Sequence, residues 1–284
     1  MSEIELLDGA MGSEFIKRGI RLPEHTWSAN MNIEKPETVY EIHKEYIDAG
    51  ANYITTNTFR TTPRAYMKTG LDVDAATKLA RKSLLGAINA ATKASNATTK
   101  VLGSVAPLED CYKPDLFPGK VIAKKEFEQL AQWLDIKEVD IILIETMNSV
   151  IEAETCIKAF AKCNKPIWIS FILKNNHHIL SGETILTAIK MLKKYNVSAF
   201  LVNCSPLYIT HKSLKVISEN WDKKWGVYPN LGVGPPSPNG DIKIIHSNDN
   251  YIKLFYTATG LGAELLGACC GSSPEHIKLL HRFL

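Results

Sequence analysis

The stretch ELLGACCGSSPEH, residues 264–276, joins an apolar run to two adjacent cysteines and then to the start of a helix. Ser273 is a candidate N-cap, and Pro274 stands at the first helical position, where a missing backbone N–H costs nothing. Adjacent cysteines rarely bridge each other, because disulfide geometry requires Cα atoms farther apart than the roughly 3.8 Å between chain neighbours. The stretch therefore predicts a strand that ends in two thiols, Cys269 and Cys270, which are either small buried residues or joint ligands.

The same pattern of an apolar run followed by a helical segment recurs along the chain. Seven further strand-like runs cover residues 4–9, 52–59, 100–107, 140–146, 166–173, 197–205 and 225–230. Apolar residues recur at steps of three and four over 39–49, 73–91, 127–134, 151–161 and 185–192. Continuous apolar strands separated by amphipathic helices are typical of a parallel sheet covered on both faces.

Eight such units within 284 residues predict a (β/α)8 TIM barrel, formed as one domain by residues 1–284. Two small domains and a doubly wound open sheet are the alternatives. No G-x-G-x-x-G motif follows the first run, which disfavours the dinucleotide-binding form of the open sheet.

Composition excludes several classes of function. The net charge is only +3, and no block of like charges is present, so the sequence does not indicate nucleic-acid binding. The N-terminus is acidic where a signal peptide is basic, and no run approaches eighteen apolar residues, so we expect a cytoplasmic protein without membrane contact. In a reducing compartment, six cysteines indicate metal binding or catalysis rather than a disulfide framework.

Polar and reactive residues stand where the predicted strands end, which in a TIM barrel is where active sites are built. These residues are Asp8, Thr56, Asn57, Thr58, Glu145, Thr146, Asn203, Cys204, Tyr228, Asn230, Cys269 and Cys270. Strands six and eight are near neighbours in a closed barrel, so Cys204 can meet Cys269 and Cys270 at one rim. Three cysteines that converge in this way predict a zinc site with one open position.

Simpler interpretations exist for single residues. A buried cysteine is more often a small apolar residue than a ligand, and we prefer that interpretation for Cys111, Cys156 and Cys163. Asp8 could cap the turn at Gly9, and Glu145 could be a buried carboxylate paired to a neighbouring strand. Position alone does not decide between these roles and substrate binding.

Five motifs carry a resemblance over nearly the whole chain: LLDGAMGSEF (6–15), AGANYITTNTF (49–59), IETM (144–147), FLVNCSP (200–206) and GACCGSSPEHI (267–277). In this order they resemble the homocysteine S-methyltransferase family. The resemblance implies a (β/α)8 barrel and Zn2+ held by Cys204, Cys269 and Cys270. Ala268 stands where the family motif usually has its second glycine.

The resemblance also implies how homocysteine binds. Asp8, Thr56 and Glu145 would hold its amino-acid end, with Asp8 and Glu145 as the candidate catalytic carboxylates. Asn57, Asn203 and Trp27 complete the candidate substrate-binding set.

The chemistry explains why thiols and a metal are needed. Methyl transfer to homocysteine requires a thiolate, and a free thiol with a pKa of about 8.5 is mostly protonated at neutral pH unless a metal removes the proton. A cationic methyl donor is recognised by aromatic faces or carboxylates, for which Trp27, Phe59 and Tyr112 are candidates.

The motifs do not identify the donor. HTWSAN (25–30) and VYPN (227–230) resemble members that use S-methylmethionine or S-adenosylmethionine, whereas TTNTF (55–59) resembles the homocysteine module of cobalamin-dependent methionine synthase.

We therefore expect a zinc-dependent S-methyltransferase that makes methionine from homocysteine and a small sulfonium or ammonium donor. One alternative is a homocysteine-activating module that takes its methyl group from a methylcorrinoid on a partner protein. An alternative of another class is a non-catalytic barrel with a structural zinc, which would normally need a fourth protein ligand. The segment 230–241, rich in glycine and proline, is predicted to be a lid or a surface loop. The oligomeric state is not predicted.

Overall fold

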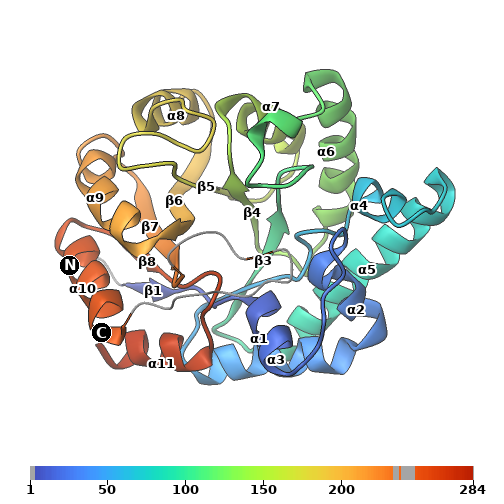
Figure 1. Cartoon of the computed structure of the whole chain (residues 1–284), viewed down its shortest axis with the longest axis horizontal. Coiled ribbons are helices and arrows are strands. Elements are labelled where there is room, and N and C mark those ends of the chain that lie inside the picture. Colours follow the sequence, from blue (N-terminus) through green and yellow to red (C-terminus); the bar gives the residue numbers. More distant parts are fainter. Residues whose placement is uncertain (1–3, 233–236, 238–246, 284) are drawn as a thin grey trace.

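The computed structural model describes residues 4–232, 237 and 247–283. Eight parallel strands surround a central axis and helices surround the strands, as Figure 1 shows in a view down the barrel. The strands are β1 (Glu5–Leu6), β2 (Tyr53–Thr55), β3 (Lys100–Val105), β4 (Ile141–Met147), β5 (Ile167–Phe171), β6 (Val197–Pro206), β7 (Lys224–Asn230) and β8 (Leu265–Leu266). The structure is a (β/α)8 TIM barrel, which confirms the predicted fold class.

The barrel closes through the two ends of the chain. The strand order is β1-β8-β7-β6-β5-β4-β3-β2, so β1 pairs with β8 at Glu5↔Leu265 and Leu6↔Leu266. A parallel bridge between Leu7 and Tyr53 joins β1 to β2 and completes the circle. All eight strands lie within the runs that the sequence predicts or extend at most one residue beyond them.

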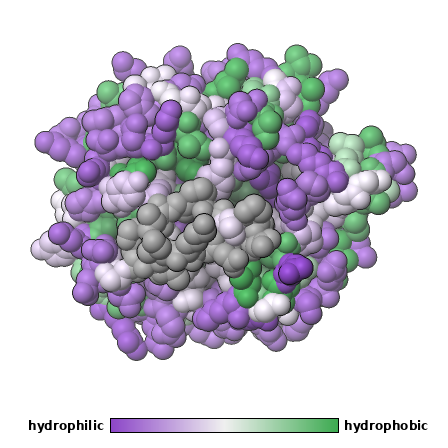
Figure 2. Space-filling view, viewed as in Figure 1, coloured by the Kyte–Doolittle hydropathy of each residue, from purple (hydrophilic) through white to green (hydrophobic). Residues whose placement is uncertain are grey.

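Helices cover the outside of the barrel. They are α1 (Met11–Lys17), α2 (Met31–Glu34), α3 (Pro36–Asp48), α4 (Pro63–Met67), α5 (Val73–Ala94), α6 (Lys120–Leu134), α7 (Val150–Phe160), α8 (Ile185–Leu192), α9 (Leu207–Ser218), α10 (Asn248–Gly260) and α11 (Pro274–Phe283). Helix α11 begins at Pro274, as its position after Ser273 predicts. None of the helices in the described residues has the length and apolar character needed to cross a membrane. Hydrophilic side chains cover most of the outer edge of the face seen in Figure 2.

The barrel interior is packed with side chains that the strands present at alternate positions. Leu7, Tyr53, Leu143, Trp168 and Leu201 belong to one buried apolar cluster, to which every strand or its next residue contributes. Within it the rings of Tyr53 and Trp168 meet edge to face, with centroids 4.7 Å apart. Interior packing of this kind is characteristic of TIM barrels. A layer of polar residues lies on this apolar interior, at the C-terminal ends of the strands.

Candidate functional site

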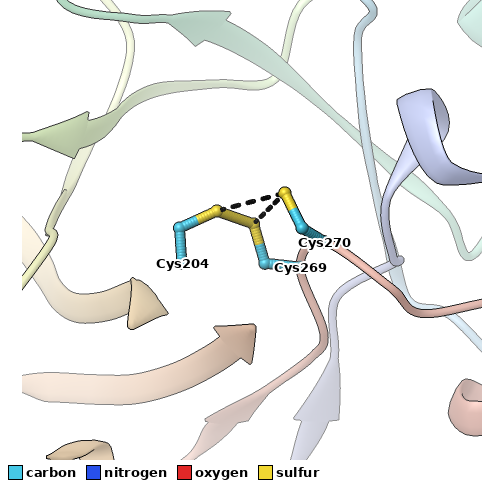
Figure 3. A group of neighbouring side chains, drawn as sticks. All are labelled: Cys204, Cys269 and Cys270. Carbon is cyan, nitrogen blue, oxygen red and sulfur yellow. Dashed lines mark hydrogen bonds between the residues drawn. A yellow bond between two sulfur atoms is a disulfide. The ribbon is translucent and has the colours of Figure 1, made fainter. Parts of the chain in front are cut away.

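Three cysteines meet at the C-terminal ends of β6 and β8, and we call Cys204, Cys269 and Cys270 the thiol cluster. Their sulfur atoms lie within 4.8 Å of one another. Cys204 and Cys269 are joined by a disulfide, and the Cys270 sulfur lies 3.8 Å from Cys204 and 3.9 Å from Cys269. Figure 3 shows the three sulfur atoms pointing toward one another. The structure therefore brings together the cysteines that the sequence places 65 residues apart, and it also joins two of them by a bond that the sequence analysis did not expect.

The thiol cluster lies in the wall of a cavity of about 590 Å³. This volume is within the range of small-molecule sites and is large enough for an amino acid together with a second small molecule. Asp8, Thr56, Asn57, Glu145 and Trp27 line the same cavity, as do Phe59 and Tyr112. Burial raises the pKa of the free thiol of Cys270 to about 12, so this thiol stays protonated near neutral pH when no cation is beside it.

Asp8 is a buried carboxyl group at the end of the first strand. Its two oxygens accept hydrogen bonds from Thr55, one from the backbone N–H at 2.7 Å and one from the hydroxyl at 2.9 Å. Burial raises the pKa of Asp8 from 3.8 to about 8; the two bonds from Thr55 oppose this rise, and the nearby charge of Glu145 adds to it. Asp8 is therefore mostly uncharged at neutral pH while no cation is beside it.

Glu145 is the second buried carboxyl group of the cavity. Ser104 donates a hydrogen bond to it, and the Tyr228 hydroxyl also interacts with it. Burial raises the pKa of Glu145 from 4.5 to about 7, although both hydroxyl contacts oppose the rise. Two carboxyl groups held near neutrality in one cavity are suited to receive a cation, because an ammonium group between them favours their charged form.

Thr56 and Asn57 line the cavity, but their side chains are already engaged in holding neighbouring segments. The Thr56 hydroxyl accepts a hydrogen bond from the backbone N–H of Ser104. The Asn57 amide donates to the carbonyl oxygen of Ser28 at 2.9 Å and to Asn32 at 2.8 Å. These contacts fix the segment that carries Trp27.

Trp27 has a left-handed backbone with φ 49°, a conformation that a residue with a side chain rarely adopts. Its indole lies against Gly12 of α1, where an added Cβ would lie 2.6 Å from Nε1. Glycine at position 12 therefore allows the ring to take its place in the cavity wall.

Asn203 does not line the cavity. It is fully buried, its Nδ2 donates to the Thr146 hydroxyl at 2.7 Å, and its Oδ1 accepts from Ser170 at 3.0 Å. Alternation along β6 turns its side chain toward the barrel interior, and a contact between Asn203 and substrate stays a prediction. Asn203 holds other residues of the site.

Sequence reasoning missed three residues of the site. Ser104 and Ser170 are single hydroxyl residues within apolar strands, and that interruption was the available signal. Cys111 was interpreted as structural, yet it lines the cavity beside Arg60 and Tyr112. Burial raises the pKa of Cys111 to about 12, and its sulfur is not part of the thiol cluster. The predicted lid, residues 230–241, falls largely outside the described residues, which include only 230–232 and 237 of it.

The fold and the site together define the class of protein. The chain is a TIM barrel with a cavity at the C-terminal ends of the strands and three thiols in the wall of that cavity. It shares its fold with a type I 3-dehydroquinate dehydratase from Clostridium difficile, at 10% identity and a TM-score of 0.53, over 100% of this chain and 94% of that one.

The particular family follows from the sequence model "Homocysteine S-methyltransferase", which matches residues 5–284. The chain belongs to this family. It is 29% identical to homocysteine S-methyltransferase of Escherichia coli K12, over 98% of this chain and 94% of that protein. It is 26% identical to homocysteine S-methyltransferase 1 of Brassica oleracea, over 98% and 93% of the two chains.

Solved structures of the homocysteine methyltransferase MmuM from Escherichia coli match the fold closely. The structure of its oxidized form has a TM-score of 0.85 at 26% identity, and it covers 99% of this chain and 96% of that one. The structure of its metallated form has a TM-score of 0.83 at 29% identity, over 100% and 97% of the two chains.

Proposed function

We propose that this chain transfers a methyl group from a small cationic donor to the thiol of homocysteine, giving methionine, and that its thiol cluster binds zinc. The observation that supports this proposal most strongly is the convergence of three thiols and two buried carboxyl groups on one cavity. Family membership supports the acceptor, because the named relatives are homocysteine S-methyltransferases.

The thiol cluster fits zinc by composition and by spacing. Sulfur ligands at about 2.3 Å from a tetrahedral ion lie ~3.8 Å from one another. The Cys270 sulfur has this spacing from both of its neighbours, at 3.8 and 3.9 Å. Cys204 and Cys269 become ligands only as thiolates, so two electrons from a thiol reductant must first open their disulfide. Three protein ligands leave one position for the sulfur of homocysteine, and zinc in this site would keep that sulfur deprotonated.

The chain's own residues bind and orient the amino-acid end of homocysteine. Asp8 and Glu145 would receive the ammonium group, and both ionise as it approaches because its charge offsets the effect of burial. Thr55 and Ser104 hold the two carboxyl groups in place, so that little reorganisation is needed when the substrate binds. The sulfur is then directed toward the thiol cluster, and alignment for an in-line displacement is the remaining task.

A cationic donor would bind in the aromatic part of the same cavity. Trp27, Phe59 and Tyr112 line it, and aromatic rings attract a sulfonium or quaternary ammonium centre. The Arg60 guanidinium lies over the Phe59 ring, 5.2 Å from its centroid, so Trp27 and Tyr112 are the stronger candidates. Such a donor leaves as a neutral molecule after transfer, so no general acid is needed. S-methylmethionine and S-adenosylmethionine are the donors we propose to test first, and a cytoplasmic location would supply the reducing conditions that the thiols require.

The test is methionine formation by reduced, zinc-loaded protein given homocysteine and one donor at a time. The donor panel is S-methylmethionine, S-adenosylmethionine, betaine, dimethylsulfoniopropionate and methylcobalamin. We expect methionine with at least one sulfonium or ammonium donor. Serine replacements of the thiol cluster should abolish it, whereas Cys156→Ser, a buried thiol on α7 away from the cavity, should not.

Two results would contradict the proposal. Methionine formation with methylcobalamin alone would favour the corrinoid-dependent alternative. Zinc binding without turnover of any donor would favour a structural metal.

A further inference from the structure

In two strands of the barrel, the alternation of side chains between the interior and the helices breaks at the edge of the site. On β6, Ala199 and Leu201 face the barrel interior, whereas Phe200 and Val202 pack toward the helices. Strict alternation would therefore point the side chain of residue 204 away from the cavity. Cys204 instead has φ 46°, the pairing of β6 with β7 shifts register between residues 203 and 206, and Cys204 lines the cavity.

Strand β4 has the same feature. Leu143 faces the interior and Ile144 faces the helices, so alternation would leave Glu145 inside and Thr146 outside. Thr146 has φ 57°, the pairing with β5 shifts register between residues 144 and 147, and Thr146 lines the cavity. A left-handed backbone is unfavourable for a β-branched residue, so the surrounding contacts must hold it.

Those contacts converge on Ser170, which lies on β5 between the two strands. Its hydroxyl is 3.1 Å from the backbone nitrogen of Thr146, 3.0 Å from Oδ1 of Asn203 and 2.6 Å from the hydroxyl of Tyr228. Asn203, the residue before Cys204, also donates to the Thr146 hydroxyl at 2.7 Å. The two irregular strand ends are thus tied to each other directly and through Ser170.

The hydroxyl of Ser170 lies within hydrogen-bonding distance of three buried polar groups. A hydroxyl has one proton and two lone pairs. The Thr146 N–H can only donate and the Asn203 Oδ1 can only accept, so Ser170 accepts from the first and donates to the second. The hydroxyl of Tyr228, which lies 2.6 Å away and also contacts Glu145, completes its surroundings. Alanine at this position would leave the Thr146 N–H and the Asn203 Oδ1 without this partner.

We propose that Ser170 is a positioning residue that orients Cys204 for the metal by clamping the ends of β4 and β6. The inference rests on the proposed role of the thiol cluster, but it concerns a residue that touches neither metal nor substrate. Ser170 is completely buried and does not line the cavity. It acts on Cys204 through Asn203.

The test is the zinc affinity of reduced Ser170→Ala, measured by competition with a chromogenic chelator without homocysteine. Loss of a residue that orients a metal ligand typically weakens binding about 10-fold to 100-fold, and we expect a loss in this range. The visible spectrum of the Co2+-loaded variant should also lose intensity, because the ligand geometry becomes less regular.

Thr146→Val is a second variant in case Ser170→Ala does not fold. It is nearly isosteric and removes the hydroxyl that accepts from Asn203, so it should weaken zinc binding as well. The double variant should lose less than the product of the two single losses, because both act through one network.

Ser213→Ala is the matched control, since Ser213 is completely buried and, among the described residues, its hydroxyl bonds only to the Thr210 carbonyl within α9. It should keep the wild-type zinc affinity even if its thermal stability falls. Wild-type affinity in Ser170→Ala and Thr146→Val would overturn the inference while leaving the proposed function intact. A wild-type protein that binds zinc but makes no methionine would overturn the function and leave this test valid, whereas one that binds no zinc would overturn both.

Discussion

Replacing Asp8 by asparagine should stabilise the protein above pH 8 and weaken its binding of homocysteine. Asparagine keeps the shape of the buried side chain, and its amide can accept from the Thr55 N–H while donating to the Thr55 hydroxyl. The replacement removes only the charge that burial opposes. Stability and binding should therefore move in opposite directions.

The size of the effect follows from the pKa of Asp8, which burial raises from 3.8 to about 8. Between these values the folded protein holds a proton that the unfolded chain releases, so stability falls as pH rises. The contribution of Asp8 is fully present below pH 3.8 and is lost by about pH 8. At about 1.4 kcal/mol per pH unit, the upper bound on this loss is roughly 6 kcal/mol.

Thermal unfolding of wild type and Asp8→Asn at pH 4 and pH 8.5 tests this reasoning. Since about 1 kcal/mol shifts the midpoint by roughly 2 °C in a chain of this size, Asp8→Asn should melt several degrees above wild type at pH 8.5. The two proteins should melt within about 1 °C of each other at pH 4. Asp222→Asn, at an exposed carboxylate paired with Lys193, should shift neither midpoint relative to wild type.

The binding measurement uses zinc-loaded protein at pH 8. Asp8→Asn should bind homocysteine about tenfold to a hundredfold more weakly, because a hydrogen bond to a charged group contributes roughly 1.5–3 kcal/mol. An unchanged midpoint at pH 8.5 together with unchanged homocysteine binding would show that Asp8 is a turn residue and that its burial has no functional consequence.

Three further predictions follow from the site. Protein purified without chelator should carry about one zinc per chain by elemental analysis. Each serine replacement in the thiol cluster should lose most of this zinc, because an alcohol is a poor zinc ligand, and full retention in all three variants would exclude the site. Glu145→Gln should keep zinc but raise the KM for homocysteine at least tenfold by loss of a charge-assisted bond, and unchanged kinetics would make this carboxylate structural. Gly12→Ala should displace Trp27 and raise the KM for the donor several-fold, with little effect on the KM for homocysteine. In the control Gly260→Ala, an added Cβ meets no atom within 4 Å, so neither KM should change.

The barrel could be predicted from sequence because its strands are buried on both faces. Each run therefore reads as continuously apolar, and the run ends mark the rim of the barrel without any knowledge of pairing. The thiol cluster followed from topology, since β6 and β8 are separated only by β7 in a closed barrel. Cavity positions for Asp8 and Glu145 followed in the same way.

The directions of individual side chains could not be predicted. Period-two alternation along β6 points Cys204 outward, and nothing in VSAFLVNCS indicates that the chain turns left-handed at a residue other than glycine. The turn depends on Ser170, on another strand, so the cause is tertiary. Cys111 illustrates the same limit, because a loop of irregular backbone decides whether a thiol faces the core or the cavity.

The buried carboxyl groups also limit what the site can discriminate. Homocysteine and methionine have the same amino-acid end, so Asp8 and Glu145, which line the cavity, would bind both in the role we propose and could not by themselves favour release of the product. The difference between the two molecules lies at sulfur, where a thiolate is a strong zinc ligand and a neutral thioether is a weak one. Release must therefore depend on the sulfur end, and the carboxyl groups set how much affinity remains for methionine after transfer.

Near pH 7 both carboxyl groups regain protons easily once the ammonium group leaves, since the pKa of Glu145 is about 7 and that of Asp8 about 8. Burial that weakens the empty protein at alkaline pH thus lowers the affinity of the two carboxyl groups for the ammonium group of homocysteine and of methionine alike.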